Sequence, residues 1–174
     1  MHKRVLKWVS LLLLIPTMSV LSATENTSTT NDAGAKPLVN PFIYDRTVKG
    51  EMKEVYQKIF TALENNGYFV LFEPNIGKNL SHFAKRWGEN YNKNKLDDIR
   101  SMVFCNGWYA NKISNIDPSL LALCPLRLTL YTKNKETHIL FLRPGKVAGN
   151  SKAQKVAKEL EDDIIKTIEV AITS

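Results

Sequence analysis

Two apolar segments near the C-terminus, LRLTLYT (126–132) and THILFLR (137–143), are separated by the polar tetrapeptide KNKE. Short β-prone runs on either side of such a turn predict a β-hairpin. After the hairpin, Val156, Leu160 and Ile164 recur every four residues and predict an amphipathic helix. A sheet and a helix that each carry one apolar face bury those faces most simply against each other. This end of the chain therefore predicts a sheet packed against a helix.

The polar side of the last helix is expected to face solvent, because charged residues occupy its other positions. These residues are Lys155, Glu159, Glu161, Asp162 and Lys166. Asn150 or Ser151 is expected to cap its first turn.

The segments before the hairpin alternate between helical and strand patterns. Helices are predicted over 51–63, about 79–87 and 115–123, and strands over 68–73 and 99–105. The strand YFVLFE is apolar throughout, which predicts burial on both faces. Trp87 is expected to face the core, and Asp117 is expected to cap the third helix. The predicted element order is α-β-α-β-α-β-β-α.

This order predicts an α/β fold, a single two-layer α/β sandwich with a mixed four-stranded sheet and packed helices. Strands that are separated by helices favour some parallel pairing, whereas the hairpin adds an antiparallel pair. The domain is expected to span residues 46–174 and is preceded by a flexible polar leader, 24–45, rich in Thr, Ser and Asn. About 130 ordered residues suffice for one core.

The first 23 residues have the pattern of a secretory signal peptide. A basic start, MHKRVLKW, precedes an apolar run that is shorter than the roughly 20 residues needed to span a bilayer. Cleavage is predicted after Ser22 or Ala23, which would leave a periplasmic or secreted bacterial protein without a stable membrane span. Removal of this segment lowers the net charge from +7 to +4. With no basic cluster interleaved with aromatic residues, nucleic-acid binding is not expected.

The two cysteines, Cys105 and Cys124, end a predicted strand and a predicted helix. An exported chain with two cysteines is a disulfide candidate, but both positions also suit buried free thiols. A soft copper or haem site would need further ligands, for which His82 and Met102 are weak candidates. No Cys-x-x-Cys pair or other familiar catalytic motif occurs. No cofactor is predicted, and an enzyme is less expected than a binding protein.

Residues 52–147 resemble the DUF302 family (domain of unknown function 302). The resemblance rests on ALENNGYFVLFE, on MVFCNGWYA and, most specifically, on IDPSLLALCPLRLTLYTKNKETHILFL. The family turn Gly-Asn-Pro is replaced by Cys105-Asn106-Gly107, and Leu123 stands where a polar residue is usual. The resemblance implies a small α/β fold, and the family supplies no common activity to transfer.

The CNGWYA turn is the expected ligand site. Trp108 and Tyr109 follow a strand end, where aromatic residues line a pocket or close a core. Asn106 is added because the resemblance places it in the family turn. The leading hypothesis is therefore a non-catalytic exported domain that binds a small ligand or an envelope protein partner. The alternative is a thiol- or metal-linked (copper or haem) periplasmic redox protein.

Overall fold

The computed structural model describes residues 40–174. The predicted signal peptide and residues 24–39 of the predicted leader lie outside the described residues. The strands are β1 (Ile43–Lys49), β2 (Phe69–Phe72), β3 (Asp98–Cys105), β4 (Leu126–Lys133) and β5 (Glu136–Leu142). The helices are α1 (Met52–Asn65), α2 (Ile76–Ser81), α3 (Ala84–Trp87), α4 (Gly107–Ile116), α5 (Pro144–Val147) and α6 (Gln154–Thr173). Two short 3₁₀ helices, η1 (Gly88–Asn90) and η2 (Pro118–Leu123), complete the fold.

The strands form one sheet in the order β1-β5-β4-β3-β2, and every neighbouring pair is antiparallel. The expected sandwich is confirmed, but the sheet has five strands, and the expected parallel pairing is wrong. The fifth strand, β1, begins at Ile43, inside the segment expected to be leader. Between β3 and β4 the chain passes through α4 and η2, which lie against each other. This connection returns the chain to the end of the sheet that it left, so β4 runs antiparallel to β3.

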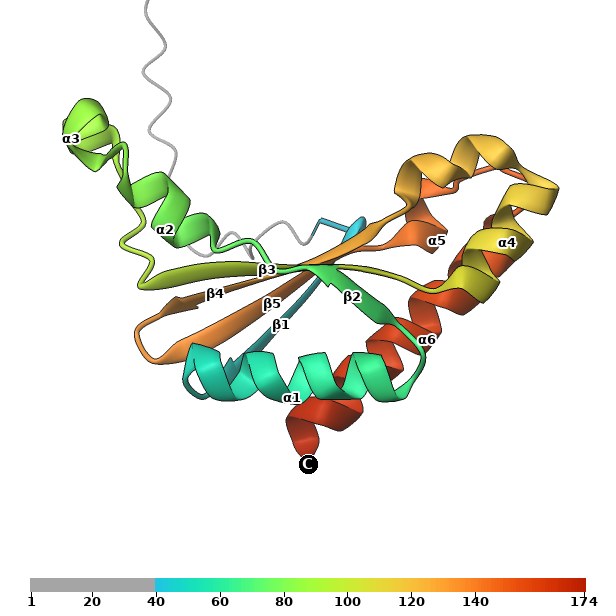
Figure 1. Ribbon diagram of the computed structural model, residues 1–174, viewed down its shortest axis with the longest axis horizontal. Helices are drawn as coiled ribbons and strands as arrows, with labels where there is room; N and C mark the ends of the chain where they lie inside the picture. The colour runs from blue at the N-terminus through green and yellow to red at the C-terminus, as the bar shows by residue number, and fades with distance from the viewer. Residues whose placement is uncertain (1–39) are drawn as a thin grey trace, which may run out of the picture. The chain divides into compact units, whose positions relative to one another are not determined.

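One face of the sheet is covered by α1 and α6, which lie on the same side in Figure 1. The core between these layers draws on both helices and on the inward side chains of β3, β4 and β5. Its fully buried members include Ile59, Leu63, Met102, Phe104, Leu128, Leu130, Ile139, Phe141, Ile164 and Ile168. The other face is flanked by α2 and α3 on one side and by η2 and α5 on the other (Figure 1). No helix of residues 40–174 crosses its centre, and we call it the open face.

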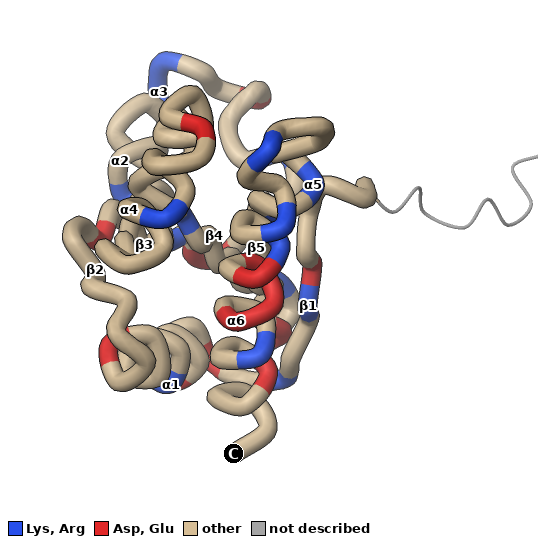
Figure 2. Tube along the Cα trace, turned by 90° about the vertical axis from the view of Figure 1, so that its right-hand side faces the viewer, with Lys and Arg blue, Asp and Glu red and all other residues tan. Residues whose placement is uncertain are grey.

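The apolar stripe of α6 is confirmed, because Val156, Leu160 and Ile164 are buried. Charged residues follow the outer side of this helix in Figure 2. Glu161 is the exception: it was expected in solvent but is fully buried. Its carboxylate accepts hydrogen bonds from Arg143 and from the backbone of Gly145, so the side chain is satisfied inside.

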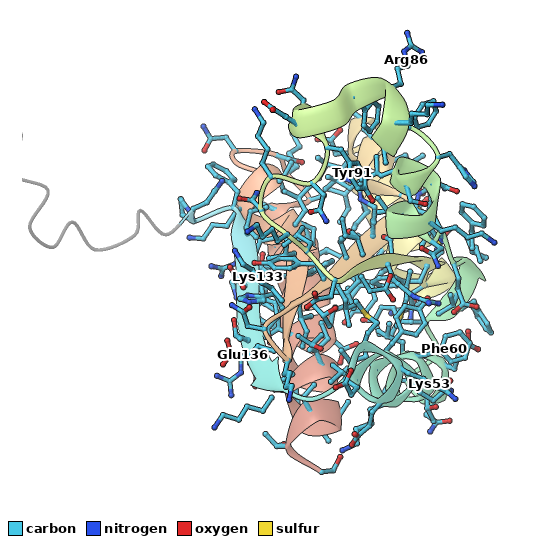
Figure 3. The ribbon with its side chains drawn as sticks, turned by 90° about the vertical axis from the view of Figure 1, so that its left-hand side faces the viewer. Lys53, Phe60, Arg86, Tyr91, Lys133 and Glu136 are labelled. Atoms are coloured by element: carbon cyan, nitrogen blue, oxygen red, sulfur yellow. The ribbon has the colours of Figure 1, made fainter. Side chains whose placement is uncertain are left out.

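Two expectations about burial are wrong on the β2 side of the sheet. β2 is an edge strand, and Phe69, Leu71 and Phe72 are each more than 60% exposed. Phe69 pairs with Cys105 and therefore lies on the open face with it, where no second layer from residues 40–174 covers it. Trp87 does not face the core: it is 40% exposed and stacks on Phe83. Figure 3 shows Arg86 at the outer tip of the same segment.

Candidate functional site

The two cysteines meet where β3 and β4 leave the sheet. Cys105 is the last residue of β3, and Cys124 follows η2 and is separated from β4 by Pro125. Their sulfur atoms lie 3.3 Å apart, and both residues are free thiols that are partly exposed. Burial, followed by the contact with Cys105, raises the pKa of the Cys124 thiol to about 11. The structure thus brings together two thiols separated by 19 positions in the sequence.

Asn106 is held by backbone groups and is the N-cap of α4. Its Oδ1 accepts a hydrogen bond from the Tyr109 amide at 3.1 Å, and its Nδ2 donates to the Gly67 carbonyl at 3.1 Å. The side chain therefore joins the start of α4 to the turn that precedes β2. The CNGWYA segment was expected to form a turn, but from Gly107 onward it forms α4. Its signal was an Asn followed by Tyr109 and Ile113 at helical spacing.

The two aromatic residues of the CNGWYA segment differ in burial: Trp108 points outward and Tyr109 inward. Trp108 is 66% exposed, whereas Tyr109 is half-buried and packs against the core. The ammonium group of Lys112 lies over both rings, 5.8 and 5.9 Å from their centroids. The cavity between Tyr109 and the thiols holds about 20 Å³, which suits a water-sized molecule only.

The weak metal candidates do not join the thiols. Met102 is fully buried on the core face of β3, whereas Cys105 lies on the other face of the same strand. His82 is exposed at the end of α2. Within residues 40–174 no group of three or more His, Cys, Asp and Glu side chains is placed to hold a metal ion. Residues 40–174 therefore supply no further metal ligand beside the two thiols.

A larger depression lies on the open face, close to the thiols, and holds about 620 Å³. It is lined by Ile43, Val103, Ala122, Leu123, Pro125, Leu126, Arg127, Thr129, Leu140, Phe141, Leu142 and Pro144. We call it the open-face groove. Leu123 and Leu126 also line the small cavity beside the thiols, so the two hollows share a wall.

Among residues 40–174, Arg127 is the only charged residue that lines the open-face groove, and Thr129 is the other polar side chain in the lining. Arg127 is exposed and forms no ion pair with any carboxylate of residues 40–174. The groove therefore combines apolar walls with one cation that is free to meet an anion. Sequence reasoning did not single out Arg127, although its outward place in the alternating run LRLTLY was a signal.

Comparison with known proteins identifies the family of the chain. The family model for the domain of unknown function DUF302 matches residues 44–171. The chain belongs to the DUF302 family. The crystal structure of an uncharacterized conserved DUF302 protein from Bacillus stearothermophilus has a TM-score of 0.63 and 20% sequence identity. The match covers 75% of this chain and 98% of that chain, and at this identity it shows the fold alone. No curated protein matches the sequence.

The DUF302 domain also has a groove of about 930 Å³ between α1 and α6. Its lining carries charges of both signs, including Lys53, Glu54, Lys58 and Lys166. Figure 3 shows Lys53 on the outer side of α1. Lys58 and Glu54 already pair with each other at 3.6 Å. We therefore regard this groove as the space between two solvated helices rather than as the first ligand candidate.

The far end of the open face of the DUF302 domain is polar. His138 stacks on Tyr131 with 4.3 Å between ring centroids, and its Nδ1 lies 2.9 Å from the Thr47 hydroxyl. Beyond this cluster, Lys133 and Glu136 mark the β4–β5 turn in Figure 3. The open face thus changes from apolar to polar along β4 and β5. Among residues 40–174, no helix has the length and apolar character needed to cross a bilayer.

Proposed function

We propose that this DUF302 domain is a non-catalytic binding protein that takes an amphipathic small molecule with one anionic group in the open-face groove. The observation that carries the proposal is the guanidinium of Arg127, which pairs with no carboxylate of residues 40–174 and lies among walls that are apolar apart from Thr129. The apolar body of the ligand would lie along Val103, Leu140 and Leu142, and its carboxylate or phosphate would meet Arg127. A guanidinium binds either group through two parallel hydrogen bonds.

The size and composition of the groove support this ligand class. Small-molecule sites measure about 300–1,000 Å³ and combine apolar walls with a few polar groups, and the open-face groove fits both criteria. A ligand with a second charged group would leave that group against apolar residues, at a cost in desolvation. The predicted signal peptide adds a context for the proposal, namely an exported carrier or sensor of amphiphiles in the cell envelope.

Calorimetric titration with decanoate and with the uncharged decanol tests the proposal. The two probes share a chain length and differ in the head group, so they separate apolar from ionic binding. We expect decanoate to bind more tightly than decanol. Arg127→Gln should weaken decanoate binding by about tenfold, equivalent to about 1.4 kcal/mol, and leave decanol unchanged.

Two variants control this titration. Lys133→Gln removes a basic residue from the same strand but outside the groove lining, and it should bind both probes as the wild type does. Leu142→Asp places a carboxylate in the exposed apolar wall, and it should weaken both probes. A wild-type protein that binds neither probe, or an unchanged affinity in Arg127→Gln, would overturn the proposal.

A protein partner is a second candidate, because β2 leaves one edge unpaired within residues 40–174. Its exposed residues Phe69, Leu71 and Phe72 are apolar, and such an edge accepts an extended segment of another chain. Leu71→Lys would block this pairing without touching the core. Loss of a co-purifying protein in this variant, with decanoate affinity unchanged, would support the partner over the small ligand.

A further inference from the structure

We propose that Cys105 and Cys124 form a reversible intramolecular disulfide that links the end of β3 to the start of β4. This inference goes beyond ligand binding and does not depend on it. The two sulfur atoms are 3.3 Å apart in the thiol form. A disulfide needs about 2.05 Å, so a movement of about 1.2 Å closes the bond.

The backbone around the thiols supports this closure. β3 and β4 are hydrogen-bonded neighbours, and Phe104 pairs directly with Leu126. Cys105 and Cys124 lie just beyond this last pair, at the ends of adjacent strands. Cys105 is fixed on its other side by the N-cap of α4, and Cys124 by the hydrogen bond from its amide to the Leu121 carbonyl. The rotation of two side chains is therefore the main change required.

The surroundings favour a disulfide over a metal site. The space beside the thiols is lined mostly by apolar residues such as Ile113 and Leu120. Of its polar side chains besides the thiols, Asn106 is already bonded to the Gly67 carbonyl and the Tyr109 amide, and Tyr109 is not among the soft ligands that thiolate metal sites use. Both cysteines are partly exposed, so a small disulfide reagent has access to them. The predicted export would place the chain in an oxidising compartment, where such bonds persist.

The reaction is thiol–disulfide exchange with a low-molecular-weight disulfide, RSSR, as the oxidant. The Cys105 thiol loses its proton, and its sulfur attacks one sulfur of RSSR and releases RS⁻, which leaves a mixed disulfide on Cys105. The Cys124 thiolate then attacks the Cys105 sulfur and releases the second RS⁻. Two protein thiols are oxidised, one RSSR is reduced, and the two RS⁻ take up the two protons. The same exchange balances when Cys124 attacks RSSR first and Cys105 resolves the mixed disulfide, because the two sulfur atoms lie 3.3 Å apart.

Equilibration of the folded wild-type protein with oxidised and reduced glutathione tests the proposal. After acid quenching, free thiols are alkylated in denaturant and the peptides are mapped by mass spectrometry. We expect one species that lacks two hydrogens and carries a Cys105–Cys124 cross-link, and we expect excess reduced dithiothreitol to restore both thiols. Complete alkylation of both cysteines under oxidising conditions would overturn the proposal, and so would stable glutathione adducts on both.

Single variants test whether each thiol resolves the mixed disulfide of the other. Cys124→Ser should stop at a glutathione adduct on Cys105, and Cys105→Ser should stop at a glutathione adduct on Cys124. Failure of both folded variants to form an adduct would overturn the exchange route. Because the cross-link is mapped in the wild type, that result stands even if a variant folds poorly.

Discussion

At the scale of single residues, the buried carboxylate of Glu161 joins separate parts of the chain. Arg143, which follows β5, donates to its Oε1 from Nε at 2.9 Å and from Nη2 at 2.7 Å, and the Gly145 amide donates to its Oε2 at 3.0 Å. Gly145 has no room for a side chain, because an added Cβ would lie 2.8 Å from the Lys158 Cα. The connection between β5 and α6 is therefore held in place by the buried Glu161 carboxylate.

We predict that Glu161→Ala lowers the free energy of unfolding by about 3–5 kcal/mol, because Arg143 and the Gly145 amide lose their acceptor. Urea unfolding followed by circular dichroism measures this change. Glu159→Ala is the control, since Glu159 is exposed on the same helix and pairs with Lys112 only at the surface. The control should change stability by less than about 1 kcal/mol. Equal effects in both variants would show that burial of Glu161 is not stabilising.

The Cys124 thiol predicts a dependence on alkaline pH. Its pKa is raised from 9.0 to about 11 in the folded protein, mainly by burial. The neutral thiol is therefore favoured by folding, and its contribution to stability is complete below pH 9.0 and is lost as the pH rises through about 11. We expect the alkylation rate of Cys124 in the folded, reduced protein to rise at a higher pH than in urea. Coincident pH profiles would contradict this prediction.

At the scale of elements, α4 shows where local patterns mislead. The sequence CNGWYA contains Asn-Gly, which favours a turn, yet Asn106 caps a helix of 10 residues. The same side chain also bonds the Gly67 carbonyl, a contact between segments far apart in the sequence. The predicted cap at Asp117 is confirmed: its carboxylate accepts from the Ser119 amide and also from the Ser151 hydroxyl. The expected cap of α6 at Asn150 or Ser151 is wrong, because α6 begins after Ala153, which makes no side-chain cap. One local cap was thus predictable, whereas the long-range partners of Asn106 and Asp117 were not.

Substitution of Asn106 should therefore affect stability rather than ligand binding. Asn106→Ala is expected to cost about 1–2 kcal/mol, because α4 loses its cap and the Gly67 carbonyl loses a donor. Asn106→Asp keeps the capping oxygen and should cost less. Thermal unfolding measures both changes, with Asn111→Ala, at an exposed position in α4, as the control. Loss of decanoate binding in a folded Asn106→Ala protein would instead place the ligand at the CNGWYA segment.

At the scale of the whole molecule, the sequence predicted the sandwich, the hairpin and the stripe of α6 because each follows from local periodicity. It did not predict the antiparallel order or the exposure of β2. Both depend on where the connections return the chain to the sheet. An apolar run such as FVLF has the same sequence pattern whether it forms an edge strand or a central strand. The proximity of the two thiols depends on β3 and β4 being neighbours in the sheet, which is likewise a matter of strand order and not of local pattern. The open-face groove was missed, because its walls come from segments between Ile43 and Pro144.

The disulfide should act on the stability of the whole domain. Closure of the loop between Cys105 and Cys124 restricts the unfolded chain, and the chain-entropy account gives about 3 kcal/mol. We predict that the oxidised protein has the higher midpoint in guanidinium, and that Cys105→Ser/Cys124→Ser resembles the reduced wild type. An oxidised form that is less stable than the reduced form would show that the bond strains the β3–β4 ends.

The most direct test of the ligand site is a nuclear magnetic resonance titration of the isotope-labelled, reduced protein with decanoate. We predict that shifts concentrate on the open-face groove, at Val103, Arg127, Thr129 and Leu140, and that Arg127→Gln reduces them at the same sub-saturating decanoate concentration. Shifts centred on Gln57 and Lys166 would place the ligand between α1 and α6 and contradict the assignment of the open-face groove. An absence of shifts at saturating decanoate would contradict the binding function itself.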